Sequence, residues 1–154
     1  MARQFSISVR ARSDGARTEV YRLLTDSSTW AAWTPFTSVT LGSEARGGGE
    51  GVGAVRQTRY AGLAGRERIV ALVPGRHMSY AYIKGAFTPY MRDYVALVDL
   101  EDDGEGTLIH WHSTSTSRFA GSGRIPYRTL RKFLQRCADG LAAAAGPGPP
   151  GVTG

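Results

Sequence analysis

The middle of the chain reads as a succession of β-strands, and this pattern limits the folds that it can adopt. Between residues 38 and 117, stretches with the two-residue alternation and the β-branched or aromatic composition of strands are separated by Gly-rich or Pro-Gly turns. The predicted strands are 38–45, 52–61, 65–73, 77–84, 92–100 and 107–117. One turn, Asp-Asp-Gly-Glu-Gly at 102–106, is typical of a hairpin. The pattern therefore predicts an antiparallel sheet.

The N-terminal segment predicts one more strand and two short helices. Apolar residues alternate with serines from residue 5 to residue 9, which is the period of a half-buried strand. Residues 13–15 break this strand and offer an N-cap to a helix over Ala16–Thr25. A polar stretch then ends that helix and caps a second, shorter one, which carries Trp30 and Trp33.

The only long helix is predicted from Pro126 to about Ala145. Its apolar residues recur at the helical period and form one stripe: Leu130, Phe133, Leu134, Cys137 and Leu141. A curved sheet of this length has one face to cover and a single long helix to cover it, so we expect a space between them. A ligand would sit in that space. Residues 1–145 are expected to form a single domain, and the Gly/Pro-rich tail 146–154 is expected to be disordered.

Aromatic residues gather in the strands that would surround this space. They belong to the segment from the fourth to the sixth of the central strands: Tyr80, Tyr82, Phe87, Tyr90, Tyr94 and Trp111. Aromatic rings that line a concave site bury apolar ligand surface and leave hydroxyl groups to orient the ligand. The segment therefore indicates a cavity for an apolar molecule and contains no recognisable catalytic signature.

The net charge of the chain is positive, but it does not indicate binding to nucleic acid. The formal charge of +6 comes almost entirely from arginine, because Lys84 and Lys132 are the only lysines. The basic residues that cluster have helical spacing and are expected to form a solvated outer face: Arg124, Arg128, Arg131, Lys132 and Arg136. A basic charge is not a nucleic-acid-binding motif, so we expect no nucleic-acid partner.

The single cysteine, Cys137, excludes an intramolecular disulfide and a cysteine metal cluster. Without a signal-like or membrane-spanning stretch, we expect a cytoplasmic monomer or homodimer with no integral membrane association.

Five segments follow one another with sensible spacing between residues 5 and 145. They are Leu24-Thr-Asp26 with Trp30-Ala-Ala-Trp33-Thr-Pro35, Gly51-Val-Gly53-Ala-Val-Arg56, Glu67-Arg-Ile-Val70, Pro74-Gly-Arg-His-Met-Ser-Tyr80 and Gly106-Thr107-Leu-Ile-His-Trp111. Together they resemble the SRPBCC superfamily, which includes birch-pollen-allergen-like proteins, START lipid-transfer domains and polyketide aromatase/cyclases. The bacterial polyketide cyclase/dehydrase branch is the most similar.

The resemblance implies an α+β helix-grip fold. In this fold a curved antiparallel sheet of about seven strands wraps around a long C-terminal helix, with two short helices after the first strand. Most members bind an apolar molecule and a minority catalyse a reaction, so the function has to be argued from the site.

The resemblance also places candidate ligand-binding residues. Trp30 and Trp33 share a helix face, and both can be core residues, but the family pattern brings the second one nearer the cavity. Tyr80 and Tyr82 are expected on one strand face with Met78. The predicted ligand-binding set combines these with residues of the next strands and the last helix: Trp33, Phe36, Tyr80, Tyr82, Tyr94, Trp111, Leu130 and Leu134.

No catalytic residue can be assigned from the sequence. Aromatase/cyclases of the superfamily are thought to promote aldol condensation and dehydration, which need a group that polarises a carbonyl and a group that moves protons. The charged strand residues are candidates, although alternation sends only half of them inward: Arg56, Arg59, Glu67, Arg68, Arg92 and Asp93. An arginine and a carboxylate that converge inside the cavity would favour an enzyme.

Two other motifs could indicate a bound metal ion or a phosphate group, and we expect neither. His110 and His112 could be two metal ligands, and His77 is the only other histidine. The family register turns Trp111 toward the cavity and both histidines outward, so we expect solvated histidines and no metal. The Gly-rich stretch 47–53 lacks the Lys-Ser/Thr of a phosphate loop, and it is expected to be a flexible loop and a candidate lid at the cavity entrance.

Three functions remain open from the sequence. The first is binding of a small apolar or aromatic molecule, lipid- or polyketide-like, as a carrier or sensor. The second is a cyclase/dehydratase-like enzyme that acts on a polyketide in the cavity. The third is a co-chaperone-like docking module that uses the basic face of the last helix. A cavity filled by its own side chains, with an exposed apolar patch beside that helix, would favour the third.

Overall fold

The structure is a computed structural model, and it describes residues 3–85, 88, 90–118 and 124–146. Within these residues the strands are β1 (Gln4–Ser13), β2 (Ser38–Ser43), β3 (Val55–Tyr60), β4 (Leu63–Val73), β5 (His77–Lys84), β6 (Met91–Asp103) and β7 (Gly106–Ser117). They form one seven-stranded antiparallel sheet in the order β1-β7-β6-β5-β4-β3-β2. The first strand therefore pairs with the last, and the intervening strands follow one another as a meander.

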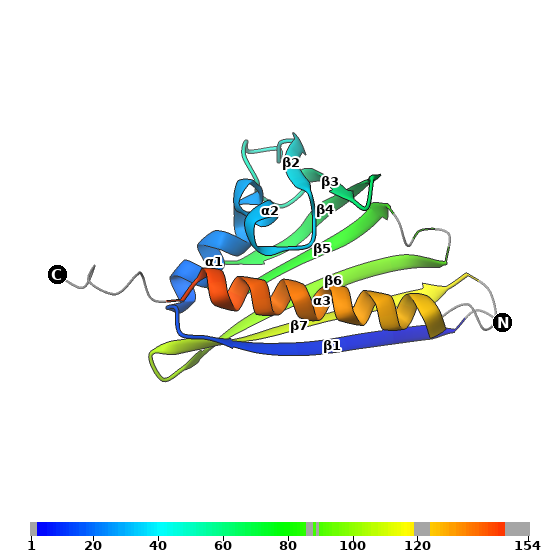
Figure 1. The fold of residues 1–154 in the computed structure, drawn as a ribbon. Coiled ribbons are helices and arrows are strands. Elements are labelled where there is room, and N and C mark those ends of the chain that lie inside the picture. The colour runs from blue at the N-terminus through cyan, green and yellow to red at the C-terminus, as the bar shows by residue number, and fades with distance from the viewer. Residues whose placement is uncertain (1–2, 86–87, 89, 119–123, 147–154) are drawn as a thin grey trace.

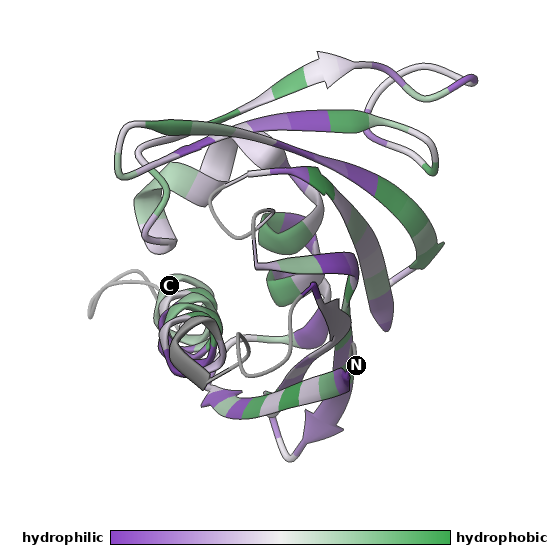
Figure 2. Ribbon diagram, turned by 90° about the vertical axis from the view of Figure 1, so that its right-hand side faces the viewer, coloured by the Kyte–Doolittle hydropathy of each residue, from purple (hydrophilic) through white to green (hydrophobic). Residues whose placement is uncertain are grey.

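Four helical segments complete the described part of the chain. Helix α1 (Arg17–Thr25), the short 3₁₀ segment η1 (Ser27–Thr29) and α2 (Trp30–Trp33) connect β1 to β2, and α3 (Arg124–Ala144) follows β7. Helix α3 lies along the concave side of the sheet, with α1 and α2 near its C-terminal end (Figure 1). Seen close to the axis of α3, the sheet curves around one side of the helix (Figure 2). This arrangement confirms the predicted helix-grip fold.

Alternation along the strands sets which side chains face α3. In β7, Ile109 and Trp111 are completely buried, whereas His110 and His112 lie on the opposite face and are only partly covered. In β6 the same rule buries the residues predicted to face inward: Tyr94, Ala96, Val98 and Leu100. The strand register predicted for this part of the sheet is therefore confirmed.

Two local details explain how the helices are held. Gly140 in α3 sits so close to α2 that a Cβ atom there would lie 1.8 Å from the carbonyl oxygen of Trp33, so only glycine allows this contact. Asp26 caps η1, because its carboxylate accepts the backbone N–H of Ser28, as predicted. The predicted side-chain cap of α1 is wrong. Ala16 takes that position, because β1 continues to Ser13, whose hydroxyl instead donates to the carbonyl of Ala142 at 2.7 Å.

The core lies between the sheet and α3. The α3 stripe is buried as predicted, apart from Phe133, which is half-buried: Leu130, Leu134, Cys137 and Leu141. Trp30 and Trp111 are completely buried at the end of this space where α2 packs, with ring centroids 5.9 Å apart. The aromatic Phe87 and the tail beyond Gly146 lie outside the described residues. Among the described residues, no helix has both the length and the apolar character needed to cross a bilayer.

Candidate ligand-binding site

A small cavity lies between the sheet and the first half of α3. Its walls are almost entirely apolar or aromatic: Phe36, Tyr60, Glu67, Tyr80, Tyr82, Met91, Tyr94, Leu130, Phe133 and Leu134. The volume is about 30 Å³, which is close to the share of one water molecule in the liquid. Pockets that hold drug-sized ligands measure about 300–1,000 Å³. The side chains that line this cavity therefore nearly fill it.

Six of the eight residues predicted to bind a ligand line the cavity: Phe36, Tyr80, Tyr82, Tyr94, Leu130 and Leu134. Trp111 does not line it, because its ring is packed behind the wall against Trp30 and Tyr80. Trp33 instead borders a separate surface groove with Arg136 and Gly140. The close approach of α2 to α3 at Gly140 holds Trp33 away from the cavity. Contact of any of the eight with a ligand stays a prediction.

Three half-buried rings close the cavity toward the solvent. Phe36 precedes β2, Tyr60 ends β3, and Phe133 lies on α3. The ring of Phe133 meets that of Phe36 at 5.1 Å and that of Tyr60 at 5.0 Å between centroids, both edge to face. Such pairs add only about 0.5–1.5 kcal/mol beyond the area they bury. The three rings therefore form the part of the wall that is easiest to displace.

The cavity contains one ionisable carboxyl group, that of Glu67. Glu67 on β4 is directly opposite Arg56 on β3, and both side chains point into the molecule, 2% and 0% exposed. The closest charged atoms, Arg56 Nη1 and Glu67 Oε1, are 3.9 Å apart. Neither atom has a hydrogen-bond partner among the described residues. The pair is therefore close enough to interact electrostatically but leaves one donor and one acceptor unsatisfied.

Other contacts hold the Arg56 guanidinium in place. Its Nε donates to Glu50 at 3.2 Å, and its Nη2 donates to the carbonyl of Leu24 at 3.3 Å. Its central carbon also lies 4.7 Å from the centroid of the Trp30 ring, a cation–π distance. Because these partners fix the cation, the free Oε1 of Glu67 faces a preorganised positive group.

Burial changes the proton affinity of the groups in this site. Burial raises the pKa of Glu67 to about 7, although the positive charge of Arg56 acts in the opposite direction. Burial also raises the pKa of Tyr80 and Tyr94 above the usual value for a phenol. Near neutral pH the cavity thus holds protonated phenols and a carboxyl group that exchanges its proton readily, a condition suited to general acid–base chemistry.

The structure shows which of the candidate charged residues point inward, which the sequence alone did not. Arg56 and Glu67 point inward, and the other strand charges considered as candidates are exposed: Arg59, Arg68, Arg92 and Asp93. Sequence reasoning did not include Glu67 in the ligand-binding set. The available signal was its two-residue spacing from Ile69, which is completely buried on the same face.

The Gly-rich loop does not border the cavity. None of the residues 47–53 lines it. Glu50 of this loop instead accepts hydrogen bonds from the backbone N–H and the hydroxyl of Ser27, at 3.1 and 2.7 Å, as well as from Arg56. The loop is therefore attached to the start of η1, and the interpretation as a lid at the entrance is not supported.

A curved antiparallel sheet that grips a C-terminal helix, with an apolar cavity between them, defines the START-like class of helix-grip proteins. The chain belongs to the SRPBCC-type family described as polyketide cyclase / dehydrase and lipid transport, whose family model matches residues 4–146. No match was found among curated proteins.

Solved structures support the same fold. Major latex-like protein 151 from Panax ginseng is 19% identical, with a TM-score of 0.76 over 94% of this chain and 99% of that one. A START superfamily protein from Mycobacterium smegmatis is 10% identical, with a TM-score of 0.74 over 91% and 96%. A point mutant of norcoclaurine synthase from Thalictrum flavum, solved with a transition-state analogue, is 11% identical, with a TM-score of 0.73 over 94% and 96%. At these identities the likeness shows the fold alone.

Proposed function

We propose that this chain binds a small, mainly apolar or aromatic molecule that presents one polar group to Glu67, and that it acts as a carrier or sensor of that molecule. The observation that carries this proposal is the unsatisfied Oε1 atom of a buried carboxyl group in an otherwise apolar and phenolic cavity. A wall built only for packing gains nothing from such a group, because an unpaired buried polar atom costs about 1–3 kcal/mol. A ligand hydroxyl or N–H would remove that cost.

Binding requires the cavity to open, because its present volume accommodates no more than about one water molecule. Outward rotation of Phe36, Tyr60 and Phe133 is the simplest route, since these rings are only half-buried and meet edge to face. A ligand that buries about 200 Å² of apolar surface would gain about 5 kcal/mol at 25 cal/mol per Å². This gain offsets the edge-to-face contribution of the ring pairs, about 0.5–1.5 kcal/mol each, before the area that the rings expose and the ordering of the ligand are counted.

The test has two parts: identification of a bound ligand, and a substitution that fills the cavity. Native mass spectrometry and solvent extraction of the purified protein identify any apolar molecule that copurifies, and an apolar fluorescent probe measures occupancy by displacement. Met91→Trp enlarges a buried wall residue and should abolish probe binding, whereas Val73→Trp enlarges a residue that is 48% exposed and should leave it unchanged. Circular dichroism confirms that both variants fold. Equal binding by both variants would place the probe outside this cavity and contradict the proposal.

A second candidate function, catalysis, is favoured by the Arg56–Glu67 pair. A carboxyl group with a pKa of about 7 can remove a proton from a carbon beside a carbonyl, and the resulting enolate can attack a second carbonyl of the same chain. The acid formed in the first step returns its proton to the alkoxide that results, and the regenerated carboxylate can then remove a second α-proton and pass it to the departing hydroxyl group, which leaves as water. Incubation with a thioester of a short poly-β-ketone tests this idea. Glu67→Gln should abolish cyclisation and retain binding, and if it cyclises the substrate as fast as the wild type, this role is excluded.

The nearly filled cavity meets one of the two conditions set for the docking function, but the described residues supply no exposed large hydrophobic side chain on α3. The large hydrophobic residues that are exposed lie in the strands and the loops that connect them: Val52, Leu63, Val70, Val73, Ile83 and Tyr90. None of them is on α3, whose exposed face carries Arg128, Arg131 and Arg136.

A further inference from the structure

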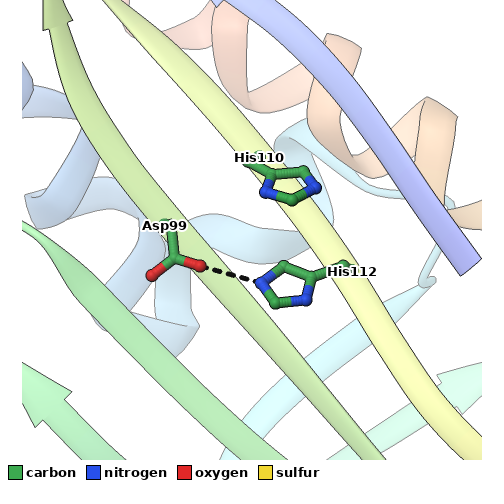
Figure 3. Close-up of side chains that lie close together, drawn as sticks. All are labelled: Asp99, His110 and His112. Atoms are coloured by element: carbon green, nitrogen blue, oxygen red, sulfur yellow. Dashed lines mark hydrogen bonds and ion pairs between the residues drawn. The ribbon is translucent and has the colours of Figure 1, made fainter. Parts of the chain in front are cut away.

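All three histidines of the chain meet on the outer face of the sheet, around one carboxylate. His77 on β5, Asp99 on β6 and His110 on β7 are directly opposite one another in the strand register. His112 follows two residues after His110 and so shares its face. The ring of His112 stacks on that of His110, with centroids 4.4 Å apart and planes inclined by 14°. Figure 3 shows both rings beside the carboxylate of Asp99.

We propose that Asp99, His110 and His112 bind a divalent transition-metal ion of the zinc class on this outer face. One ligand atom from each residue lies within 4.8 Å of the other two. Tetrahedral zinc holds such N and O atoms at about 2.0–2.2 Å, and therefore about 3.3 Å from one another, so side-chain movements of about 1 Å complete the site. Two imidazoles and one carboxylate are a ligand set that suits zinc, and the remaining coordination position would be open to water.

Two further residues already orient these ligands. Nδ1 of His77 is 2.7 Å from Asp99 Oδ1 and holds that side of the carboxylate, while Oδ2 faces Nε2 of His112 at 2.8 Å. The hydroxyl of Ser8 on β1 is 2.7 Å from Nε2 of His110, which leaves Nδ1 of that ring for a metal. Such outer partners of metal ligands fix the ring and carboxylate orientations. These contacts hold both rings and the carboxylate in defined orientations on the outer face.

An ion would enter between Asp99 and His112. It would replace the hydrogen that these two groups share, since Oδ2 and Nε2 are the atoms with free lone pairs once that proton leaves. The site borders a shallow groove on the outer face, which gives access from the solvent. The groove also carries Arg10, Arg76 and Glu101, so its charge is mixed. Solvated histidines were expected here because the family register turns both outward, and His77 was the only further ligand considered. Strand pairing instead brings Asp99 opposite His110.

The test is zinc binding by the untagged protein, after removal of metal with a chelator. Calorimetry should give one ion per chain with a dissociation constant in the micromolar range, and cobalt should give the visible absorption bands of a tetrahedral site. Asp99→Asn and His112→Gln should each weaken zinc binding by at least about tenfold. Asp102→Asn, which changes an exposed acid on the same strand, should not change it.

His77→Gln separates an orienting role from a ligand role. Loss of the hydrogen bond to Asp99 should weaken binding but preserve the stoichiometry and the tetrahedral cobalt spectrum. No saturable binding up to about 1 mM zinc, or binding that survives both ligand substitutions, would overturn the proposal. All substituted side chains lie on the outer face, so circular dichroism should show a native fold for each variant. If zinc binding fails, the proposal that the cavity on the inner face binds a ligand is not affected.

Discussion

Replacing Glu67 by glutamine should change how the stability of the protein depends on pH. The pKa of this carboxyl is about 7 in the folded chain and near 4.5 when the chain is unfolded. The folded state therefore binds the proton more tightly, and this contribution to stability is present below the unfolded pKa and is lost as the pH rises through the folded one. Glutamine has nearly the same shape and no titration. The wild type should therefore lose stability relative to Glu67→Gln as the pH rises.

The magnitude follows from the two pKa values. Each pKa unit corresponds to about 1.4 kcal/mol, so the difference is worth about 3 kcal/mol in full, of which about 2 kcal/mol falls between about pH 5 and about pH 8. At the acid end the protonated carboxyl and the amide should give similar stabilities. At the alkaline end the variant should be the more stable of the two, because it has no buried negative charge.

Urea unfolding of both proteins at several pH values measures this difference directly. Glu19→Gln is a matched control, because the side chain of Glu19 on α1 is only partly covered and the Arg22 guanidinium lowers its pKa. Its titration lies below the range studied, so the difference between this variant and the wild type should be constant from about pH 5 to about pH 8. If the curve for Glu67→Gln also stays parallel to that of the wild type, the carboxyl is not buried in the way the structure places it.

Three further substitutions test other parts of the argument. Gly140→Ala should destabilise the fold by about 1–3 kcal/mol, because the new methyl group meets the backbone of α2, whereas Gly47→Ala, with no atom near its Cβ position, should change little in thermal unfolding. Arg56→Met should cost about 3–5 kcal/mol in urea unfolding, because it leaves the buried Glu67 and the partly buried Glu50 without their cation. Phe133→Ala should open the cavity and speed the association of an apolar probe in stopped-flow fluorescence, whereas Lys132→Ala on the exposed side of α3 should leave the rate unchanged.

Local pattern predicted most of the fold. The alternation in 107–117 and 92–100 fixed which residues of β7 and β6 face α3, and the stripe on the last helix located its buried side. Long-range contacts were less accessible. Trp33 was expected at the cavity, but Gly140 draws α2 toward the far half of α3, and a glycine in a helix does not reveal what packs against it. The volume left between sheet and helix also depends on side-chain packing that no periodicity describes.

The positions and partners of the charged residues were the least predictable part of the two candidate sites. Charged strand residues usually face water, so pattern alone left Glu67 as one of six candidates and gave Asp99 no role. Each gains its partner through strand pairing. Glu67 meets Arg56 across β3 and β4, and Asp99 meets His77 and His110 across three strands. Within the described strands no register shift separates these pairs from the turns that join their strands, but residue alternation alone does not say which residue of the neighbouring strand lies opposite.

The two candidate sites belong to opposite faces of one sheet, and this makes their tests independent. Within β6, Val98 and Leu100 point toward α3, whereas Asp99 between them points outward. The strand pleat therefore separates the cavity carboxyl from the histidine cluster by a layer of backbone and buried apolar side chains. A substitution that removes a metal ligand leaves the cavity wall intact, and one that fills the cavity leaves the histidines intact. Zinc binding without a cavity ligand, or the reverse, would then show which face of the sheet has a function.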